Sequence, residues 1–202
     1  MGTFQTTVIK FNNFLFGKII QRADLSSLFS KINFPQKEHF LEIGCKDGYA
    51  LKIIKDYFSP KALIGVDIDK KSIELAKRNF SKNKVKDVNL KVADAQNLPF
   101  KNETFGAIFM FATLHHIQDW RKAIGEAKRI LKSGGYFILR EPLANFYNLP
   151  LAREIDQPAS LFKESELIDN LESSSFEILH WKYRGFYRKV FHASVEAVCR
   201  KA

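Results

Sequence analysis

The sequence predicts an α/β fold in three layers, with a mostly parallel sheet of seven strands and helices on both of its faces. Three observations support this prediction. Between residues 40 and 139, short apolar runs alternate with segments whose apolar residues recur at helical spacing. A turn containing Gly44 and Gly48 joins the first run to the first helix. After residue 141 the alternation stops, and a helix followed by two strand-like segments completes the chain.

The apolar runs place the expected strands, and the helical spacing of apolar side chains places the expected helices. Strands are expected at residues 40–43, 62–67, 88–92, 107–112, 136–139, 176–183 and 191–200. Helices are expected at residues 6–21, 25–32, 49–58, 70–79, 120–131 and 164–173. The chain of 202 residues is expected to form a single domain, 1–202, with a helical segment at 1–34, a core at 35–141 and a final segment at 142–202.

The composition is typical of a globular protein, and cytoplasmic residence is the simplest expectation. No apolar run approaches the roughly 20 residues that span a bilayer, and no cleavable signal pattern is visible. The two cysteines make neither a disulfide framework nor a metal cluster, and no metal site is expected. The net charge of +10 would suit nucleic acid, anionic lipid or an acidic substrate, but it is spread along the chain as on a solvated lysine-rich surface.

The stretch from residue 40 to residue 51 is the centre of the functional prediction. An apolar strand, a glycine turn and a helix follow one another, which places backbone N–H groups and a helix N-terminus beside a ligand. Glu42 stands just before the turn, and Asp67 ends the next apolar run. Two carboxylates that flank a glycine turn suit a ligand with a ribose diol and a cationic amine.

The motif Glu42-Ile43-Gly44-x-x-x-Gly48 resembles the first motif of the class I S-adenosylmethionine-dependent methyltransferases, and it fits the dinucleotide-binding G-x-G-x-x-G pattern less well. Four later stretches resemble the family's further motifs in the family's order: residues 65–69, 92–100, 104–117 and 129–136. The Leu-His-His at residues 114–116 is similar to that of a small, type 11-like branch. The resemblance implies a Rossmann-like methyltransferase fold, in which the terminal hairpin adds an antiparallel strand.

The resemblance also implies the cofactor S-adenosyl-L-methionine, with S-adenosyl-L-homocysteine as product. Asp67 would accept hydrogen bonds from both ribose hydroxyls, and Ile68 would pack against the adenine. Asp94 would take the adenine amino group, and the backbone N–H of Ala95 would meet a ring nitrogen. The cofactor-binding residues that the resemblance implies are Glu42, Gly44, Lys46, Gly48, Asp67, Ile68, Asp94, Ala95 and Met110.

Two positions depart from the family pattern. Lys46 stands where the family usually has the middle glycine, so it could pair with the cofactor's carboxylate, obstruct the cofactor or point into solvent. Gly106 stands where the family usually has Asp after Phe105. That Asp more often supports the strand than takes part in the chemistry. Together the two departures leave open a cofactor-binding protein without transferase activity.

His115 and His116 are the expected catalytic residues. They follow the strand at 107–112, and ligands of open α/β sheets bind at the carboxyl ends of the strands. A base of this kind is needed for an oxygen or carbon acceptor, but not for a neutral amine. The alternative is that a histidine only packs in this loop. Glu141, Phe146 and Tyr147 are expected to contact the substrate, and Glu141 could equally be structural.

The expected function is methyl transfer to a small-molecule acceptor that is apolar or amphipathic, because residues 142–152 read as an apolar wall. Aromatic and basic residues interleave in the final hairpin, which leaves nucleic acid or peripheral contact with a membrane as further partners. An RNA or protein methyltransferase is therefore an alternative, and a dinucleotide oxidoreductase a more distant one. Residues 1–34 are expected either to cover the cofactor as a lid or to pack on the sheet.

Overall fold

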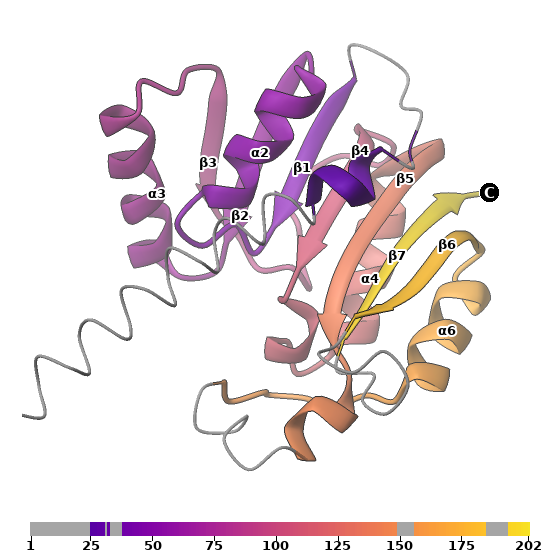
Figure 1. The fold of residues 1–202 in the computed structure, drawn as a ribbon. Coiled ribbons are helices and arrows are strands. Elements are labelled where there is room, and N and C mark those ends of the chain that lie inside the picture. Colours follow the sequence, from indigo (N-terminus) through magenta and orange to yellow (C-terminus); the bar gives the residue numbers. More distant parts are fainter. Residues whose placement is uncertain (1–24, 31, 33–37, 149–155, 185–193) are drawn as a thin grey trace, which may run out of the picture.

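Seven strands form one sheet, in the order β3-β2-β1-β4-β5-β7-β6 (Figure 1). The computed structural model describes residues 25–30, 32, 38–148, 156–184 and 194–202. The strands are β1 His39–Ile43, β2 Ala62–Asp67, β3 Val88–Val92, β4 Phe105–Phe111, β5 Leu131–Pro142, β6 Phe176–Arg184 and β7 Ser194–Lys201. The helices are α2 Tyr49–Phe58, α3 Lys70–Lys82, α4 Trp120–Ile130 and α6 Glu164–Ser173, with the 3₁₀ turns η1 Leu114–His116 and η2 Ala144–Asn148.

Strands β1 to β5 pair in parallel, and β7 lies antiparallel between β5 and β6. Helix α2 links β1 to β2, α3 links β2 to β3 and α4 links β4 to β5, whereas β3 is followed by β4 without a helix between them. This arrangement confirms the predicted fold class, including the antiparallel strand that the terminal hairpin adds.

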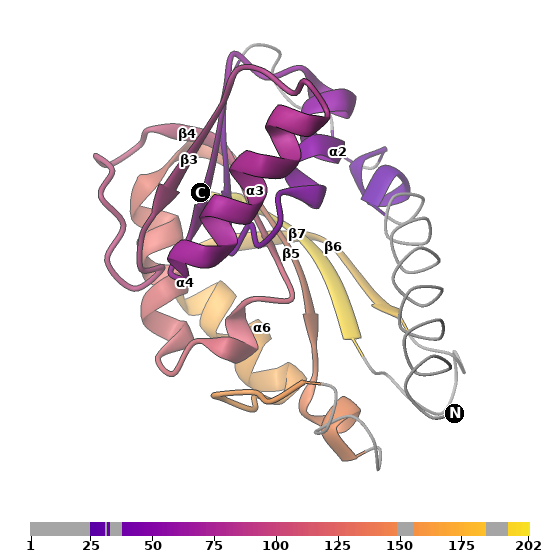
Figure 2. The same ribbon diagram turned by 90° about the vertical axis from the view of Figure 1, so that its left-hand side faces the viewer.

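The sheet is covered on both faces, and the alternation of side chains along β4 shows how (Figure 2). Ile108 and Met110 belong to the core cluster under α4 and α6. Phe109 and Phe111 point the other way, into the cluster under α2 and α3. All seven residues of β4 are buried, as expected for a central parallel strand that has no solvent-facing side.

Strand β5 is longer than the 136–139 that its apolar run predicts. It starts at Leu131, which pairs with Phe105, and the register with β4 then shifts before Ala107. Gly134 sits inside this irregular part with φ of +71°, a conformation that a glycine adopts without strain. The Ser-Gly-Gly at residues 133–135 therefore does not end the element, and the helix α4 ends at Ile130 instead of residue 131.

The described part of the N-terminal segment packs on the sheet face that α2 covers. Residues 25–29 are helical, and Leu25, Leu28 and Phe29 are fully buried. The ring of Phe29 contacts those of Phe58 and Phe109 at centroid distances of 4.8 and 5.6 Å. The expected helix at 6–21 lies outside the described residues, and so does most of the expected lid.

Among the described residues, no helix is both long enough and apolar enough to cross a membrane.

Candidate cofactor and active site

A cavity of about 400 Å³ opens at the carboxyl ends of the parallel strands. Its walls come from the segments that follow β1, β2, β3 and β4, together with Ala159. The sheet order reverses between β1 and β4, and this is the place where open α/β sheets bind their ligands. The residues that line the cavity are Ile43, Gly44, Lys46, Asp67, Ile68, Ala93, Asp94, Ala95, Gln96, Thr113, His116, Ile117, Gln118 and Ala159.

The turn after β1 comes very close to its neighbours, which explains its two glycines. Gly44 has φ of +76°, and a Cβ there would lie 2.2 Å from Oγ1 of Thr113. Gly48 has φ of +80°, and a Cβ there would lie 2.7 Å from the ring of Phe80. Any side chain at either position would both strain the backbone and clash. The turn therefore brings backbone against the floor of the cavity.

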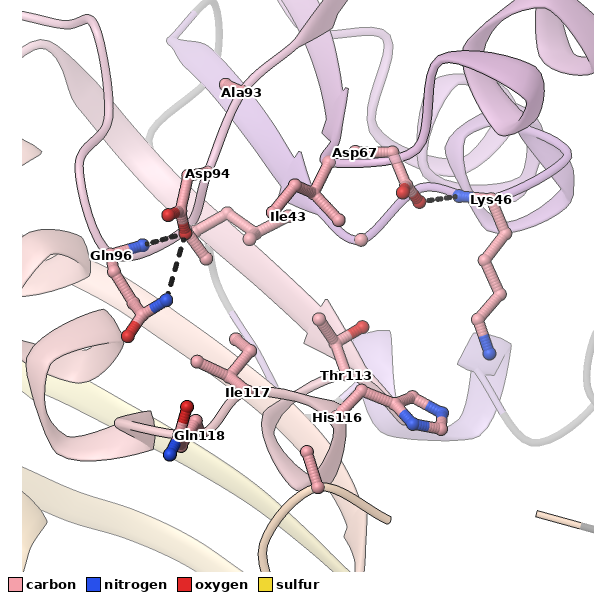
Figure 3. A pocket seen from close by; sticks show the side chains of 14 residues that line it. Ile43, Lys46, Asp67, Ala93, Asp94, Gln96, Thr113, His116, Ile117 and Gln118 are labelled. Carbon is pink, nitrogen blue, oxygen red and sulfur yellow. Dashed lines mark hydrogen bonds between the residues drawn. The ribbon is translucent and has the colours of Figure 1, made fainter. Parts of the chain in front are cut away.

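Asp67, at the end of β2, holds this turn in place (Figure 3). Its Oδ2 accepts a hydrogen bond from the backbone N–H of Lys46 at 2.9 Å, and its Oδ1 accepts one from the backbone N–H of Asp69 at 3.0 Å. Each carboxylate oxygen has a second lone pair, so the group retains acceptor capacity toward the cavity that it lines. The side chain is only 9% exposed, which fixes its position.

Asp94 and Ala95 form the opposite wall, after β3. Oδ1 of Asp94 accepts hydrogen bonds from the backbone N–H and the side-chain amide of Gln96, at 2.8 and 3.3 Å. Ile68 also lines the cavity and is 68% exposed, which is unusual for an isoleucine and provides an apolar surface for a flat ring. The predicted residues Asp67, Ile68, Asp94 and Ala95 thus meet around one cavity.

Glu42 lies buried in β1, beneath the turn. Its Oε2 has no hydrogen-bond partner among the described residues. Burial raises the pKa of this carboxyl group well above its ordinary value, the negative charges of Asp47 and Asp67 raise it further, and a backbone hydrogen bond from Leu51 opposes them. A cation bound beside the turn would restore the ionised form and supply the missing partner.

His115 is buried between two carboxylates. Its Nδ1 lies 2.8 Å from Oε2 of Glu141, and its Nε2 lies 3.0 Å from Oδ2 of Asp156. The first contact is an aligned hydrogen bond, whereas the second is close without being aligned as one. Glu141 is fully buried, and its Oε1 accepts the backbone N–H groups of Thr113 and Leu114 at 2.8 and 3.0 Å. His115 and Glu141 therefore form a fixed unit behind the wall of the cavity.

His116 is the histidine that lines the cavity. Its Nε2 lies 3.2 Å from Oδ1 of Asp156. Burial lowers the pKa of its imidazole and a positive charge on His115 lowers it further, while Asp156 raises it and Lys46 lowers it. Figure 3 shows the side chain of Lys46 extending along the cavity on the side of His116.

Several predicted site residues lie away from the cavity lining. Met110 is fully buried in the core, and Gly48 lies in the turn after β1 but does not line the cavity. Tyr147 is buried, and its hydroxyl donates a hydrogen bond of 2.8 Å to Oδ2 of Asp156. Phe146 packs edge-on against Tyr147, with ring centroids 5.1 Å apart. These two aromatic residues support Asp156 in this structure.

Other residues of the site were not anticipated from the sequence. Gln96 and Thr113 stand inside matched motifs, so their positions next to predicted residues were the available signal. Asp156 had no such signal, because it lies far along the chain from the histidines in a segment without periodicity. The fold brings it there through Ala159 and Ser160, whose backbone N–H groups donate to the carbonyl oxygen of His115 at 2.8 and 3.0 Å.

Gly106 lies at the opposite end of β4 from the cavity. A Cβ there would lie 2.7 Å from Cβ of Glu38, so the side chain of Glu38 occupies the space above this glycine. The carboxylate of Glu38 accepts a hydrogen bond from Nζ of Lys132 at 2.6 Å. A carboxylate thus stands beside this position although residue 106 has no side chain, and the departure from the family pattern does not touch the site.

Residues 41–139 match the family described as "Methyltransferase domain". The chain is 30% identical over 116 residues to the uncharacterized methyltransferase YcgJ of Bacillus subtilis, a match that covers 57% of this chain and 45% of that protein. It is 28% identical over 114 residues to a demethylmenaquinone methyltransferase of Symbiobacterium thermophilum, a match that covers 55% of this chain and 45% of that protein. The match thus spans less than half the length of either relative.

The fold is shared as well. The crystal structure of YcgJ superposes with a TM-score of 0.74 at 19% identity, covering 88% of this chain and 97% of that one. Fold, motifs and cavity together define a Rossmann-like domain of the class I type. Residues 41–139 are a methyltransferase domain, and in this part the chain is similar to the S-adenosylmethionine-dependent methyltransferases.

S-adenosylmethionine is the cofactor of this family, and the residues present fit it. Glu42 lies beneath the turn and outside the residues that line the cavity; its buried Oε2 has no hydrogen-bond partner among the described residues, so a cationic group bound at the turn would lower the cost of its burial. Asp67 retains lone pairs for ribose hydroxyls, and the exposed side chain of Ile68 provides a surface for the adenine. When bound, the cofactor supplies a methyl group already activated by its sulfonium.

Lys46 has the backbone conformation of the glycine that it replaces, since its φ is +44°. A change to Gly removes that strain together with the side chain, whereas a change to Ala removes the side chain alone. If the ammonium group holds the cofactor's carboxylate, we expect both Lys46→Gly and Lys46→Ala to weaken cofactor binding by about 1–2 kcal/mol, measured by calorimetric titration. Tighter binding in both variants would identify Lys46 as an obstruction. A change below about 0.5 kcal/mol would mean that the side chain points into solvent.

Proposed function

We propose that this protein transfers a methyl group from S-adenosylmethionine to a small-molecule acceptor. One observation carries this proposal: Asp67 and Asp94, which are expected to bind the ribose and the adenine, line the same cavity as His116. A volume of about 400 Å³ lies within the range of ligand pockets, roughly 300–1,000 Å³.

The residues of the chain have two tasks in this reaction. The first is to hold the acceptor in line with the activated methyl group and to exclude water, because the sulfonium leaves little further chemistry for the protein. Ile43, Ile117 and Ala159 supply apolar surface for this purpose. The second task is to take a proton where the acceptor atom carries one. His116 lines the cavity and lies within reach of Asp156, which orients its ring.

The acceptor is proposed to be a small apolar or amphipathic molecule. Ile43, Ile117 and Ala159 line the same cavity as His116, and among the relatives is an enzyme named for demethylmenaquinone. The described aromatic residues of the terminal hairpin serve packing: Trp181 donates to Glu164 at 3.1 Å, and the Tyr183 hydroxyl donates to the same carboxylate. Phe186, Tyr187, Arg188, Lys189 and Phe191 lie outside the described residues.

A labelling experiment tests the proposal. The purified protein is incubated with S-adenosylmethionine carrying a labelled methyl group and with a cell extract separated into small molecules, lipids, RNA and protein. We expect label in the small-molecule or lipid fraction, and much less label with the variant Asp67→Asn when the cofactor concentration is close to the Kd of the wild type. Label confined to RNA or protein would contradict the proposed acceptor. No label in any fraction from a protein that binds the cofactor would indicate a cofactor-binding protein without transferase activity.

A further inference from the structure

Three possible metal ligands meet at the edge of the cofactor cavity. They are the imidazoles of His115 and His116 and the carboxylate of Asp156, whose ligand atoms all lie within 4.8 Å of one another. The rings of the two histidines are 4.0 Å apart between centroids. Nothing in the sequence pattern points to such a cluster, because Asp156 comes from a distant segment.

The contact between His115 and Asp156 has the geometry of two ligands rather than of a donor and an acceptor. Nε2 and Oδ2 are 3.0 Å apart, yet this nitrogen has no hydrogen-bond partner among the described residues, because its N–H direction misses the oxygen. Ligand atoms about 2.0–2.2 Å from one ion lie about 2.8–3.6 Å from each other at adjacent corners of an octahedron or a tetrahedron. Their lone pairs point at the ion and not at each other.

The contact between His116 and Asp156 has the same character. Nε2 lies 3.2 Å from Oδ1, so each carboxylate oxygen faces one imidazole. The side chain of His116 is 37% exposed, so its ring has room to turn. Such a turn would shorten the distance between the ligand nitrogens of His115 and His116. Tyr147 donates a hydrogen bond to Oδ2, which leaves a second lone pair on that oxygen.

Glu141 orients His115 as the outer carboxylate of a metal centre would. Oε2 of Glu141 lies 2.8 Å from Nδ1 of His115, and a carboxylate in this position favours a proton on Nδ1, so Nε2 would be the nitrogen that binds an ion. Glu141 is itself held by the backbone N–H groups of Thr113 and Leu114. A carboxylate that holds one nitrogen of a histidine ring, while the other nitrogen faces the metal position, is the arrangement found around protein-bound zinc.

We propose that His115, His116 and Asp156 bind one divalent first-row transition-metal ion at the edge of the cofactor cavity. Two imidazoles and one carboxylate suit zinc, iron, cobalt or nickel, and suit magnesium or calcium poorly. Glu141 and Asp156 are two carboxylates at the cluster, and Lys46 is the lysine among the described residues whose charge acts on Asp156, so a dication would meet a favourable balance.

The ion's remaining positions would face the cavity, because His116 lines it. An acceptor with a hydroxyl or carboxylate oxygen would then bind the ion and be held beside the cofactor, and while the ion is bound Nε2 of His116 would be a ligand and not a base. This consequence for the acceptor rests on the proposed function, whereas the metal site itself does not.

Metal titration of the full-length, tag-free protein tests the site. After treatment with a chelator, the protein is titrated with Zn²⁺ by calorimetry and with Co²⁺ by visible absorption. We expect one equivalent of each to bind, and we expect the Co²⁺ bands of a site with nitrogen ligands. Loss of an outer-shell partner of a metal ligand weakens metal binding about 10–100-fold, so the loss of a ligand itself in Asp156→Asn or His116→Gln should weaken Zn²⁺ binding by more than about 10-fold.

His180→Gln is the matched control. His180 also faces a carboxylate, with its Nε2 3.6 Å from Oε1 of Glu196, but the described residues place no third ligand with these two. We expect this variant to bind Zn²⁺ like the wild type. Equal Zn²⁺ affinity in wild type and Asp156→Asn would overturn the proposal, and so would a Co²⁺ spectrum of the aqueous ion. S-adenosylmethionine binding, measured on the same samples, reports separately on the proposed function.

Discussion

Replacing Asp67 with Asn should weaken S-adenosylmethionine binding by about 2–3 kcal/mol, which is roughly a 30- to 150-fold rise in Kd. The carboxylate accepts from the backbone N–H groups of Lys46 and Asp69 with one oxygen each. An Asn has a single acceptor oxygen, so its amide nitrogen would face one of these donors. The variant would lose a charged acceptor for the ribose hydroxyls and would also loosen the turn. Calorimetric titration of both proteins measures the difference.

Asp56→Asn is the control for this experiment, because Asp56 is exposed on α2 and forms only an i,i+4 ion pair with Lys52. We expect its affinity for the cofactor to match the wild type. Thermal unfolding without the cofactor shows whether Asp67→Asn remains folded at the temperature of the titration. Equal affinities for Asp67→Asn and wild type would remove Asp67 from the cofactor site.

Replacing Glu141 with Ala should lower the free energy of unfolding by about 3–5 kcal/mol. The change leaves the backbone N–H groups of Thr113 and Leu114 and the Nδ1 of His115 without their buried acceptor, and it also opens a cavity. Glu141→Gln keeps one acceptor oxygen and should cost clearly less. Urea denaturation of the three proteins gives the values.

An exposed glutamate provides the comparison for Glu141. Glu177 pairs with Arg200 at 2.6 Å on the surface of the hairpin, and exposed pairs contribute up to about 1 kcal/mol. Glu177→Ala should therefore leave the midpoint of denaturation nearly unchanged. A loss of stability in Glu141→Ala no greater than in Glu177→Ala would show that the buried carboxylate is not holding the segment after β4.

The sequence predicted most of the sheet because periodicity depends on local chain geometry. The limits of β2, β3, α2 and α6 are as predicted, and those of β1 agree within one residue. Strand β5 exceeds its apolar run because Leu131 pairs with Phe105 across an irregular register, which no local pattern reveals. Burial against a neighbouring strand, and not composition, determines where such a strand begins.

The cofactor half of the site could be predicted for the same reason. Asp67 and Asp94 each follow a strand directly, so the parallel sheet places both at one edge. Asp156 could not be predicted, because its position depends on backbone contacts from residues 159 and 160 to His115. The role of Lys46 could not be predicted for a different reason. Its backbone adopts the conformation of the glycine that it replaces, while the role of its side chain depends on a bound ligand.

The sheet order also has a consequence for self-association. Strand β3 stands at one end of the order, so its outer backbone groups have no strand partner among the described residues. Such an edge can pair with another copy and start aggregation. Here the edge is only five residues long, and Asn89 and Lys91 are exposed along it. A short edge that carries a lysine, in a chain with a net charge of +10, disfavours the stacking of copies through this strand.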